Sequence, residues 1–190
     1  MFDLKEFIAG YRPFDEREAA YKEAFLYFLA AFGDNIWTRS NLTGHLTVSA
    51  WVVNPGRNKV LMAFHNIYRS WSWLGGHADG EKDLPAVARR EVEEETGVKN
   101  LKALGELPFD IDVNIVANHV KHGRQVADHL HYNVTFLFEA DESEVLKINQ
   151  AENSGVKWIK FDDIETECTE ACMMDTYKRL KEKVQLGKQE

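Results

Sequence analysis

Apolar residues recur with helical spacing in three segments of the chain. In residues 13–32 they repeat every four positions along two adjacent rows, which predicts an amphipathic helix. Residues 83–97 predict a second helix, with Asp83 at its N-cap and Gly97 at its end. Residues 166–184 predict a third helix near the C-terminus.

Between these helices, β-branched and aromatic residues gather in short runs that predict strands. The runs are residues 45–53, 59–64, 101–108, 110–117, 129–140 and 155–161. The first two flank an Asn-Pro-Gly turn and resemble a hairpin. Residues 65–82 lack periodicity but are rich in glycine and aromatic residues, so we expect an ordered functional loop there. The order of elements predicts a mixed α/β domain over residues 41–190, with a helical extension over residues 1–40 packed on it.

The composition is typical of a folded protein of one domain's size. Of 190 residues, 44% are hydrophobic and 28% are charged, and the net charge is −8. An acidic chain without a basic stripe is a poor partner for long nucleic acid, whose binding depends largely on phosphate neutralisation. No apolar run is long enough to span a membrane, and the N-terminus lacks a secretory pattern. We therefore expect a cytoplasmic protein in which Cys168 and Cys172 are idle, reduced thiols.

The second predicted helix carries an acidic cluster. At about 100° per residue, Glu91, Glu94 and Glu95 continue the apolar stripe that begins at Leu84, whereas Glu93 points away. A solvated acidic face would lie opposite that stripe. The position of these three carboxylates therefore indicates a role beyond solvation.

Clustered carboxylates need a positive partner. Like charges at spacings of three and four repel one another, and partial burial makes each ionised carboxylate costlier. Arg89 and Arg90 screen part of this charge, but hard divalent cations prefer clustered oxygens of this kind. Ahead of the helix, Gly75 and Gly76 allow backbone carbonyls to approach an ion and backbone amides to approach a phosphate oxygen. We therefore favour metal binding.

This glycine pair and the segment REVEEETGV at residues 90–98 resemble the Nudix box. The family's pattern is Gly, five residues, Glu, seven residues, then Arg-Glu-(apolar)-x-Glu-Glu-x-Gly-(apolar). The second half matches at every specified position. The first half departs, because Lys82 stands where the pattern has Glu and Glu81 lies one residue earlier. One extra residue between Glu81 and Arg90 accounts for this departure and leaves the role of Glu81 open.

The resemblance implies a fold, a chemistry and a set of ligands. The fold is an α/β/α sandwich with a mixed β-sheet. Nudix proteins typically hydrolyse a diphosphate linked to an organic group, often a nucleoside, with Mg²⁺ or Mn²⁺. By resemblance, the metal ligands are Glu91, Glu94 and Glu95, assisted by the carbonyl of Gly75 or Gly76. We expect a small phosphorylated, nucleotide-derived substrate, and a homodimer is an open alternative to a monomer.

Two further residues are candidates for the catalytic machinery. Arg90 would orient a neighbouring carboxylate. In some family members a helix glutamate is the general base, and in others an acidic residue before a late strand serves. Glu152 is the candidate of the second kind, and its alternative interpretation is a solvated loop glutamate.

Four aromatic or imidazole side chains are candidates for substrate binding. His77 follows the glycine pair directly, where a ring nitrogen could touch phosphate. His129 and His131 share one strand face, and a stabilising polar pair is the simpler interpretation for them. Trp73 could stack on a base or cover the edge of the core.

Two acidic residues of the predicted strand over residues 110–117 are interpreted as surface residues without a function. Asp110 and Asp112 alternate with Phe109 and Ile111, which predicts an exposed strand face without a function.

Two rival functions remain beside a diphosphate hydrolase. A non-catalytic Nudix-like nucleotide sensor or binding domain is the first, although it predicts damage to the glutamates that are intact here. The related isopentenyl diphosphate isomerase is disfavoured because no cysteine lies near the glycine loop. The sequence does not indicate which diphosphate is the substrate.

Overall fold

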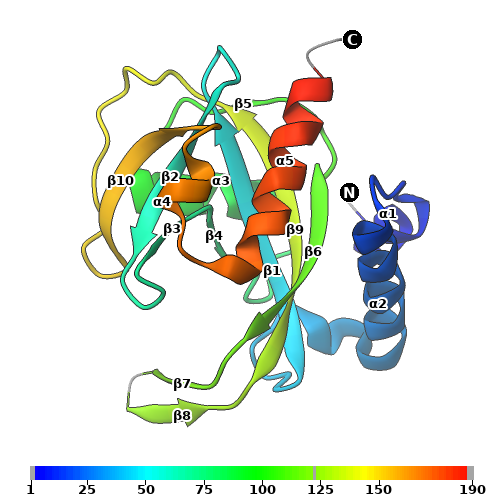
Figure 1. Cartoon of the computed structure of the whole chain (residues 1–190). Helices are drawn as coiled ribbons and strands as arrows, with labels where there is room; N and C mark the ends of the chain where they lie inside the picture. The colour runs from blue at the N-terminus through cyan, green and yellow to red at the C-terminus, as the bar shows by residue number, and fades with distance from the viewer. Residues whose placement is uncertain (1–2, 122, 188–190) are drawn as a thin grey trace.

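The chain forms a mixed β-sheet covered by helices on both faces (Figure 1). The structure, a computed structural model, describes residues 3–121 and 123–187. Its α-helices are α1 (Leu4–Gly10), α2 (Glu16–Phe32), α3 (Leu84–Thr96), α4 (Ile164–Glu167) and α5 (Met174–Leu186), with 3₁₀ turns at Gly33–Trp37 and Ala171–Met173. Its strands are β1 (Gly44–Val53), β2 (Lys59–His65), β3 (Ser70–Ser72), β4 (Leu74–His77), β5 (Lys102–Ala103), β6 (Asp110–Val116), β7 (His119–Lys121), β8 (Arg124–Val126), β9 (His129–Glu139) and β10 (Asn153–Lys160).

The sheet is built around a parallel pair of central strands. Its order is β10-β2-β1-β9-β5, with β3 beside β2, β4 beside β1 and β6 beside β9. Strands β1 and β9 run parallel in a register that places His45 opposite His131, and the other pairs in this sheet are antiparallel. Every residue of β1 is buried, as expected for a central strand covered on both faces.

Successive side chains of β1 point to opposite faces of the sheet. On one face, Val48 lies in a buried cluster with Leu84 of α3. On the other face, Trp51 lies in a second cluster with Tyr177 of α5. Figure 1 shows the same arrangement, with α5 in front of the sheet and α3 behind it. The predicted α/β/α sandwich with a mixed sheet is therefore confirmed.

The N-terminal helix α2 joins the cluster on the α3 face. Phe25 and Phe28 are buried against Tyr132 of β9, and the rings of Phe28 and Tyr132 stack with centroids 3.8 Å apart. The helix begins at Glu16 because the Asp15 side chain accepts a hydrogen bond from the backbone N–H of Glu18. Helix α1 was not predicted, since its 7 residues are too few to display a clear helical period.

The predicted continuous helix over residues 166–184 is wrong. Helix α4 ends at Glu167, and the chain continues as an irregular segment and a 3₁₀ turn before α5. The cause is tertiary. The backbone N–H of Thr169 donates to the Ser70 hydroxyl at 2.9 Å, and the Ser72 hydroxyl donates to Glu170 at 2.9 Å. The bond from Thr169 replaces the backbone hydrogen bond that a continuous helix would have made there, and the bond between the Ser72 and Glu170 side chains ties the segment to β3.

The two cysteines differ in environment because of this break. Cys168 is buried, with its Sγ 3.7 Å from the Sδ of Met62, whereas Cys172 is exposed. Both are free thiols.

Several strand predictions also needed correction. The run over residues 101–108 contains only the short β5, and residues 65–82 contain β3 and β4 rather than loop alone. The antiparallel pair β7 and β8 was not predicted and projects from the base of the sheet in Figure 1. In the part of the chain that the structure describes, no helix combines the length and the apolarity needed to cross a membrane.

The predicted exposed face at Asp110 and Asp112 is wrong, because both side chains are fully buried between β6 and α5. The Arg179 guanidinium donates to both carboxylates, at 2.8 Å to Asp110 and 2.7 Å to Asp112. The Lys183 ammonium donates to Asp110 and Glu18 at 2.8 and 2.7 Å. Burial alone would raise the pKa of Asp110, but hydrogen bonds and these cations lower it to about 2.

Candidate active site

Strand β4 and helix α3 form a loop–helix unit whose ends are capped by local hydrogen bonds. The Asp83 side chain accepts from the N–H of Ala86 at 3.1 Å, and Pro85 occupies the first turn. At the other end Gly97 adopts a left-handed conformation (φ 76°), and its N–H donates to the carbonyl of Glu93. Both predicted helix ends are confirmed, and they set which residues of α3 face the glycine pair.

Glu95 is the buried carboxylate of this unit. Its side chain is 6% exposed, and its two oxygens accept from the backbone N–H of Gly75 at 3.0 Å and from the Asn153 amide at 3.4 Å. Burial raises the pKa of Glu95, the bonds from Gly75 and Asn153 lower it, and the negative charges of Glu91 and Glu152 raise it again, so that the pKa is about 8. The described bonds to Glu95 come from neutral donors, so a bound cation would favour its ionised form.

Glu91 lies against the second glycine. A Cβ built on Gly76 would stand 2.5 Å from Glu91 Oε2, so any other residue would displace this carboxylate from its present position. Burial raises the pKa of Glu91, and the charge of Glu94 adds to this effect, while Arg90 opposes it. Arg90 lies 3.5 Å from Glu91 and 3.8 Å from Glu94.

The prediction that Glu94 faces inward is wrong, since its side chain is 57% exposed. Glu91 and Glu95 are 16% and 6% exposed and continue the covered side of α3, whereas Glu94 stands at its rim. Glu93 points away as predicted and pairs with Lys99 at 2.9 Å.

The loop before β10 adds polar groups to the same place. Glu152 is exposed, and its charge contributes to the raised pKa values of Glu91 and Glu95. Asn153 was not predicted, because nothing in its local pattern distinguishes it from a loop asparagine. Its Oδ1 is buried and has no hydrogen-bond partner among the described residues. Clustered oxygens with raised carboxylate pKa values fit a hard divalent cation.

The predicted histidines gather elsewhere. Gly76 faces α3, so its neighbour His77 points to the opposite face of the sheet, opposite Thr47 of β1. There His77 meets His131, with ring centroids 4.9 Å apart, and His131 contacts His129 at 3.2 Å between the two Nε2 atoms. The structure therefore brings these three histidines together, but on the α5 face and not among the glutamates.

Trp73 also lies on the α5 side of the sheet. Its ring meets that of Tyr177 edge-on, with centroids 5.9 Å apart, and it packs against the buried cluster beneath α5. The structure does not bring Trp73 to the glutamates.

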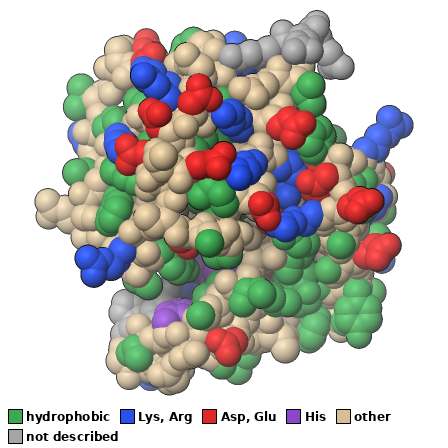
Figure 2. Space-filling view, viewed as in Figure 1, with side chains coloured by type: hydrophobic (Ala, Val, Ile, Leu, Met, Phe, Trp, Pro, Cys, Tyr) green, Lys and Arg blue, Asp and Glu red, His purple; other side chains and the backbone are tan. Residues whose placement is uncertain are grey.

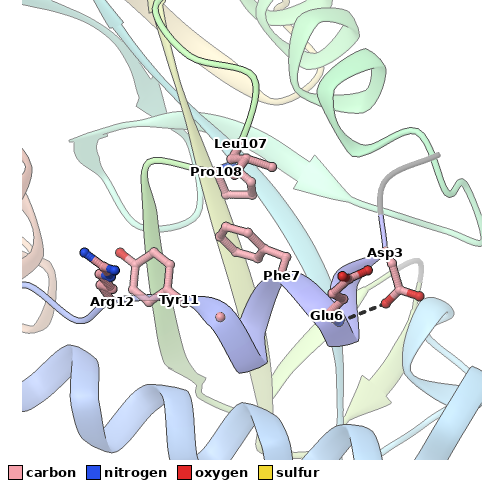
Figure 3. Close-up of a pocket in the computed structure, with 8 residues that line it drawn as sticks. Asp3, Glu6, Phe7, Tyr11, Arg12, Leu107 and Pro108 are labelled. Carbon is pink, nitrogen blue, oxygen red and sulfur yellow. Dashed lines mark hydrogen bonds between the residues drawn. The ribbon is translucent and has the colours of Figure 1, made fainter.

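A pocket of about 550 Å³ opens beside helix α1, as Figure 3 shows. Its lining residues are Asp3, Glu6, Phe7, Gly10, Tyr11, Arg12, Leu107 and Pro108. Phe7 of α1 points toward Leu107 and Pro108 in this view. None of the predicted site residues lines it.

Fold and site together define a class of protein: an α/β/α sandwich with a glycine loop and a helix of carboxylates at one end of its sheet. Comparison with known families makes this specific. The NUDIX domain matches residues 43–180, and the chain belongs to the NUDIX family.

Relatives agree with this assignment. An RNA pyrophosphohydrolase of Pelagibacter ubique (strain HTCC1062) is 29% identical over 133 residues, which cover 67% of this chain and 83% of the relative. Family and relative together identify a pyrophosphohydrolase enzyme.

Two solved structures show the same fold. A NUDIX-family hydrolase from Clostridium perfringens aligns with a TM-score of 0.52 and 18% identity, over 75% of this chain and 97% of that chain. The Nudix hydrolase RenU from M. smegmatis aligns with a TM-score of 0.51 and 18% identity, over 73% and 85%.

Proposed function

We propose that this chain hydrolyses the diphosphate linkage of a nucleoside diphosphate derivative or a similar small organic pyrophosphate, using Mg²⁺ or Mn²⁺. The observation that carries the proposal is the buried carboxylate of Glu95. It is held by the amide of Gly75 beside the carboxylate of Glu91, and its pKa is raised to about 8. A fold keeps such a costly group where a bound cation makes its charge favourable.

The residues present fit an oxygen-preferring ion. Glu91 and Glu95 offer oxygens at the floor of the site, Glu94 offers one at the rim, and the carbonyl of Gly75 or Gly76 supplements them. Mg²⁺ keeps several of its waters, so a few protein ligands suffice. When bound, the ion supplies charge neutralisation of the diphosphate and activation of a water.

The chain's own residues position this chemistry. Arg90 lies between Glu91 and Glu94 and holds both carboxylates against their mutual repulsion. Asn153 orients Glu95 through its amide. Glu152 is exposed, its charge acts on both Glu91 and Glu95, and we assign it the role of general base that takes a proton from the attacking water.

The substrate class follows from charge and from kinship. A net charge of −8 disfavours a long contact with nucleic acid and favours a short phosphorylated group reached through a cation. The curated relative is named an RNA pyrophosphohydrolase. A substrate panel therefore needs nucleoside diphosphate derivatives and an RNA oligonucleotide with a terminal phosphoanhydride.

The test compares the wild type with Glu95→Gln, Glu94→Gln and Glu93→Gln across this panel, with Mg²⁺ and with Mn²⁺. Glu93 is the matched control, because it is on the same helix but is 50% exposed and pairs with Lys99. We expect Glu95→Gln to lower kcat/KM by about 100-fold or more, as loss of one group that stabilises the transition state does. We expect Glu93→Gln to change it less than about 3-fold, as befits a surface pair.

Two results would overturn the proposal. One is a wild-type protein that binds nucleotides but cleaves no member of the panel with either ion, which is the behaviour of a sensor. The other is a loss in Glu93→Gln equal to that in Glu95→Gln.

A further inference from the structure

Histidine side chains converge on the α5 face of the sheet, away from α3. His45 comes from β1, His77 from β4, and His129 and His131 from β9. The ring centroids of His45 lie 5.0 Å from His77, 4.9 Å from His131 and 5.0 Å from His129. Figure 2 shows histidine side chains at the floor of a hollow on this face of the molecule.

The strand register holds the cluster in place. His45 and His131 are directly opposite in the parallel pair β1 and β9. His77 is opposite Thr47 in the antiparallel pair β1 and β4, and Thr47 shares the face of His45 because side chains alternate. Three neighbouring strands therefore aim imidazoles at one point from rigid backbone positions.

The hydrogen bonding of His45 leaves its Nε2 atom available as a metal ligand. Its Nδ1 lies 3.4 Å from the carbonyl of Asn41, so Nδ1 carries the proton and donates. Its Nε2 then has a bare lone pair, and this atom is buried without a hydrogen-bond partner among the described residues. A histidine whose Nδ1–H donates to a backbone carbonyl is oriented as metal-binding histidines are.

A second series of hydrogen bonds leaves a nitrogen of His131 with a lone pair as well. The Nδ1 of His129 lies 2.9 Å from the carbonyl of Ala127, so it donates, and the Nε2 of His129 becomes an acceptor. The Nε2 of His131, at 3.2 Å, must then donate to it. The Nδ1 of His131 is left with a lone pair, and His129 acts as the residue that positions His131.

We propose that His45, His77 and His131 bind one divalent transition-metal ion of the zinc type, in a site separate from Glu91 and Glu95. One nitrogen from each of the three rings lies within 4.8 Å of the others. Zn²⁺ bonds of about 2.0–2.1 Å require nitrogen atoms roughly 3.4 Å apart. Small rotations of the rings would close this difference.

Zinc suits the donor set better than magnesium does. Imidazole nitrogen is a preferred ligand of Zn²⁺, whereas Mg²⁺ prefers oxygen. Three histidine ligands leave a fourth position of a tetrahedral ion for water or for an anionic oxygen of a ligand that enters the hollow. The inference does not depend on the proposed hydrolysis, since the glutamates lie on the other face of β4.

The test measures metal binding by the full chain, with a chelating dye as competitor for Zn²⁺ and with Co²⁺ as a visible probe. We expect one tight Zn²⁺ site and visible absorption typical of tetrahedral Co²⁺. The substitutions His77→Ala and His131→Ala should each weaken Zn²⁺ binding by more than about 100-fold, because even loss of a positioning residue costs 10–100-fold. His77 is partly exposed, so His77→Ala keeps the test valid if His131→Ala fails to fold.

Two controls separate this site from other donors. His65→Ala removes a histidine that stacks on Tyr68, outside the cluster, and should leave the Zn²⁺ site unchanged. Glu95→Gln should also leave it unchanged. Loss of the site in Glu95→Gln with retention in His77→Ala would place zinc at the glutamates and overturn the proposal. A wild-type protein whose Kd for Zn²⁺ is weaker than about 10 μM would also overturn the proposal, and the cluster would then be a set of hydrogen-bonded histidines without a metal.

Discussion

Arg179 offers a direct test of the buried charges beneath α5. Its side chain is 3% exposed and donates to Asp110 and Asp112. The change Arg179→Met keeps an apolar stem of similar length and removes the charge and its hydrogen bonds. Lys178→Met is the matched control on the same helix, because Lys178 is 51% exposed and its pair with Glu165, at 3.1 Å, faces solvent.

The expected loss of unfolding free energy depends on how the two aspartates are stabilised once Arg179 is gone. Removing one partner of a buried ion pair costs about 3–5 kcal/mol. Burial, the leading cause, and the charge of Asp110 raise the pKa of Asp112 well above its ordinary value, so Asp112 can take up a proton. Lys183 still bonds to Asp110 at 2.8 Å. We therefore expect the lower end, about 3 kcal/mol.

This loss is measurable by thermal unfolding followed by circular dichroism. At about 2–4 °C per kcal/mol for a chain of this size, Arg179→Met should lower Tm by about 6–12 °C at pH 7. The exposed pair of Lys178 is worth about 1 kcal/mol or less.

The dependence on pH has a definite sign. The pKa of Asp110 is lowered from 3.8 to about 2, so its stabilising charge is fully present above pH 3.8 and is lost as the pH falls through about 2. The difference in Tm between wild type and Arg179→Met should therefore narrow toward pH 2. The reasoning would be refuted if Arg179→Met melted within 2 °C of Lys178→Met at pH 7, a spread of about 1 kcal/mol.

Two further predictions concern the glutamates. Since the pKa of Glu95 is raised from 4.5 to about 8, the protonated form stabilises the fold below pH 4.5 and that stability is lost as the pH rises through about 8. Without metal, Glu95→Gln should therefore become more stable than wild type by about 2–5 kcal/mol near pH 8.5 in urea unfolding, and parallel pH profiles would contradict this. Gly76→Ala places a Cβ 2.5 Å from Glu91 and should reduce Mn²⁺ affinity by at least about 10-fold by isothermal titration calorimetry, as a displaced ligand does. Gly10→Ala, whose Cβ meets nothing within 4 Å, is the control and should bind Mn²⁺ as the wild type does.

Local chemistry made the loop–helix unit predictable. The Asp83 cap and the left-handed Gly97 act within one turn of α3, so their residue types already specify where the helix begins and ends. The same short range applies to the apolar stripe at Leu84 and to the glutamates that continue it. The exposure of Glu94 was not predictable in this way, because it depends on which neighbours pack over α3 in the folded chain.

Contacts between residues far apart in the chain made several predictions from local patterns wrong. Residues 166–184 have a helical period, yet the Ser70 hydroxyl of β3 accepts from the backbone N–H of Thr169, and the helix is interrupted there. Asp110 and Asp112 alternate with apolar neighbours as an exposed face would, and only Arg179, far away in the chain, reveals that they are buried.

The sequence by itself determined the ends of α3, because caps and side-chain periods act between residues close in the chain, and it determined the NUDIX resemblance, which in turn implied the sandwich. Tertiary structure alone decided which polar side chains meet. The parallel register of β1 and β9 sets His45 against His131, and the packing of α5 sets Arg179 between two aspartates. No local pattern contains such information, since pairing between distant strands and helices arises only when the whole sheet has formed.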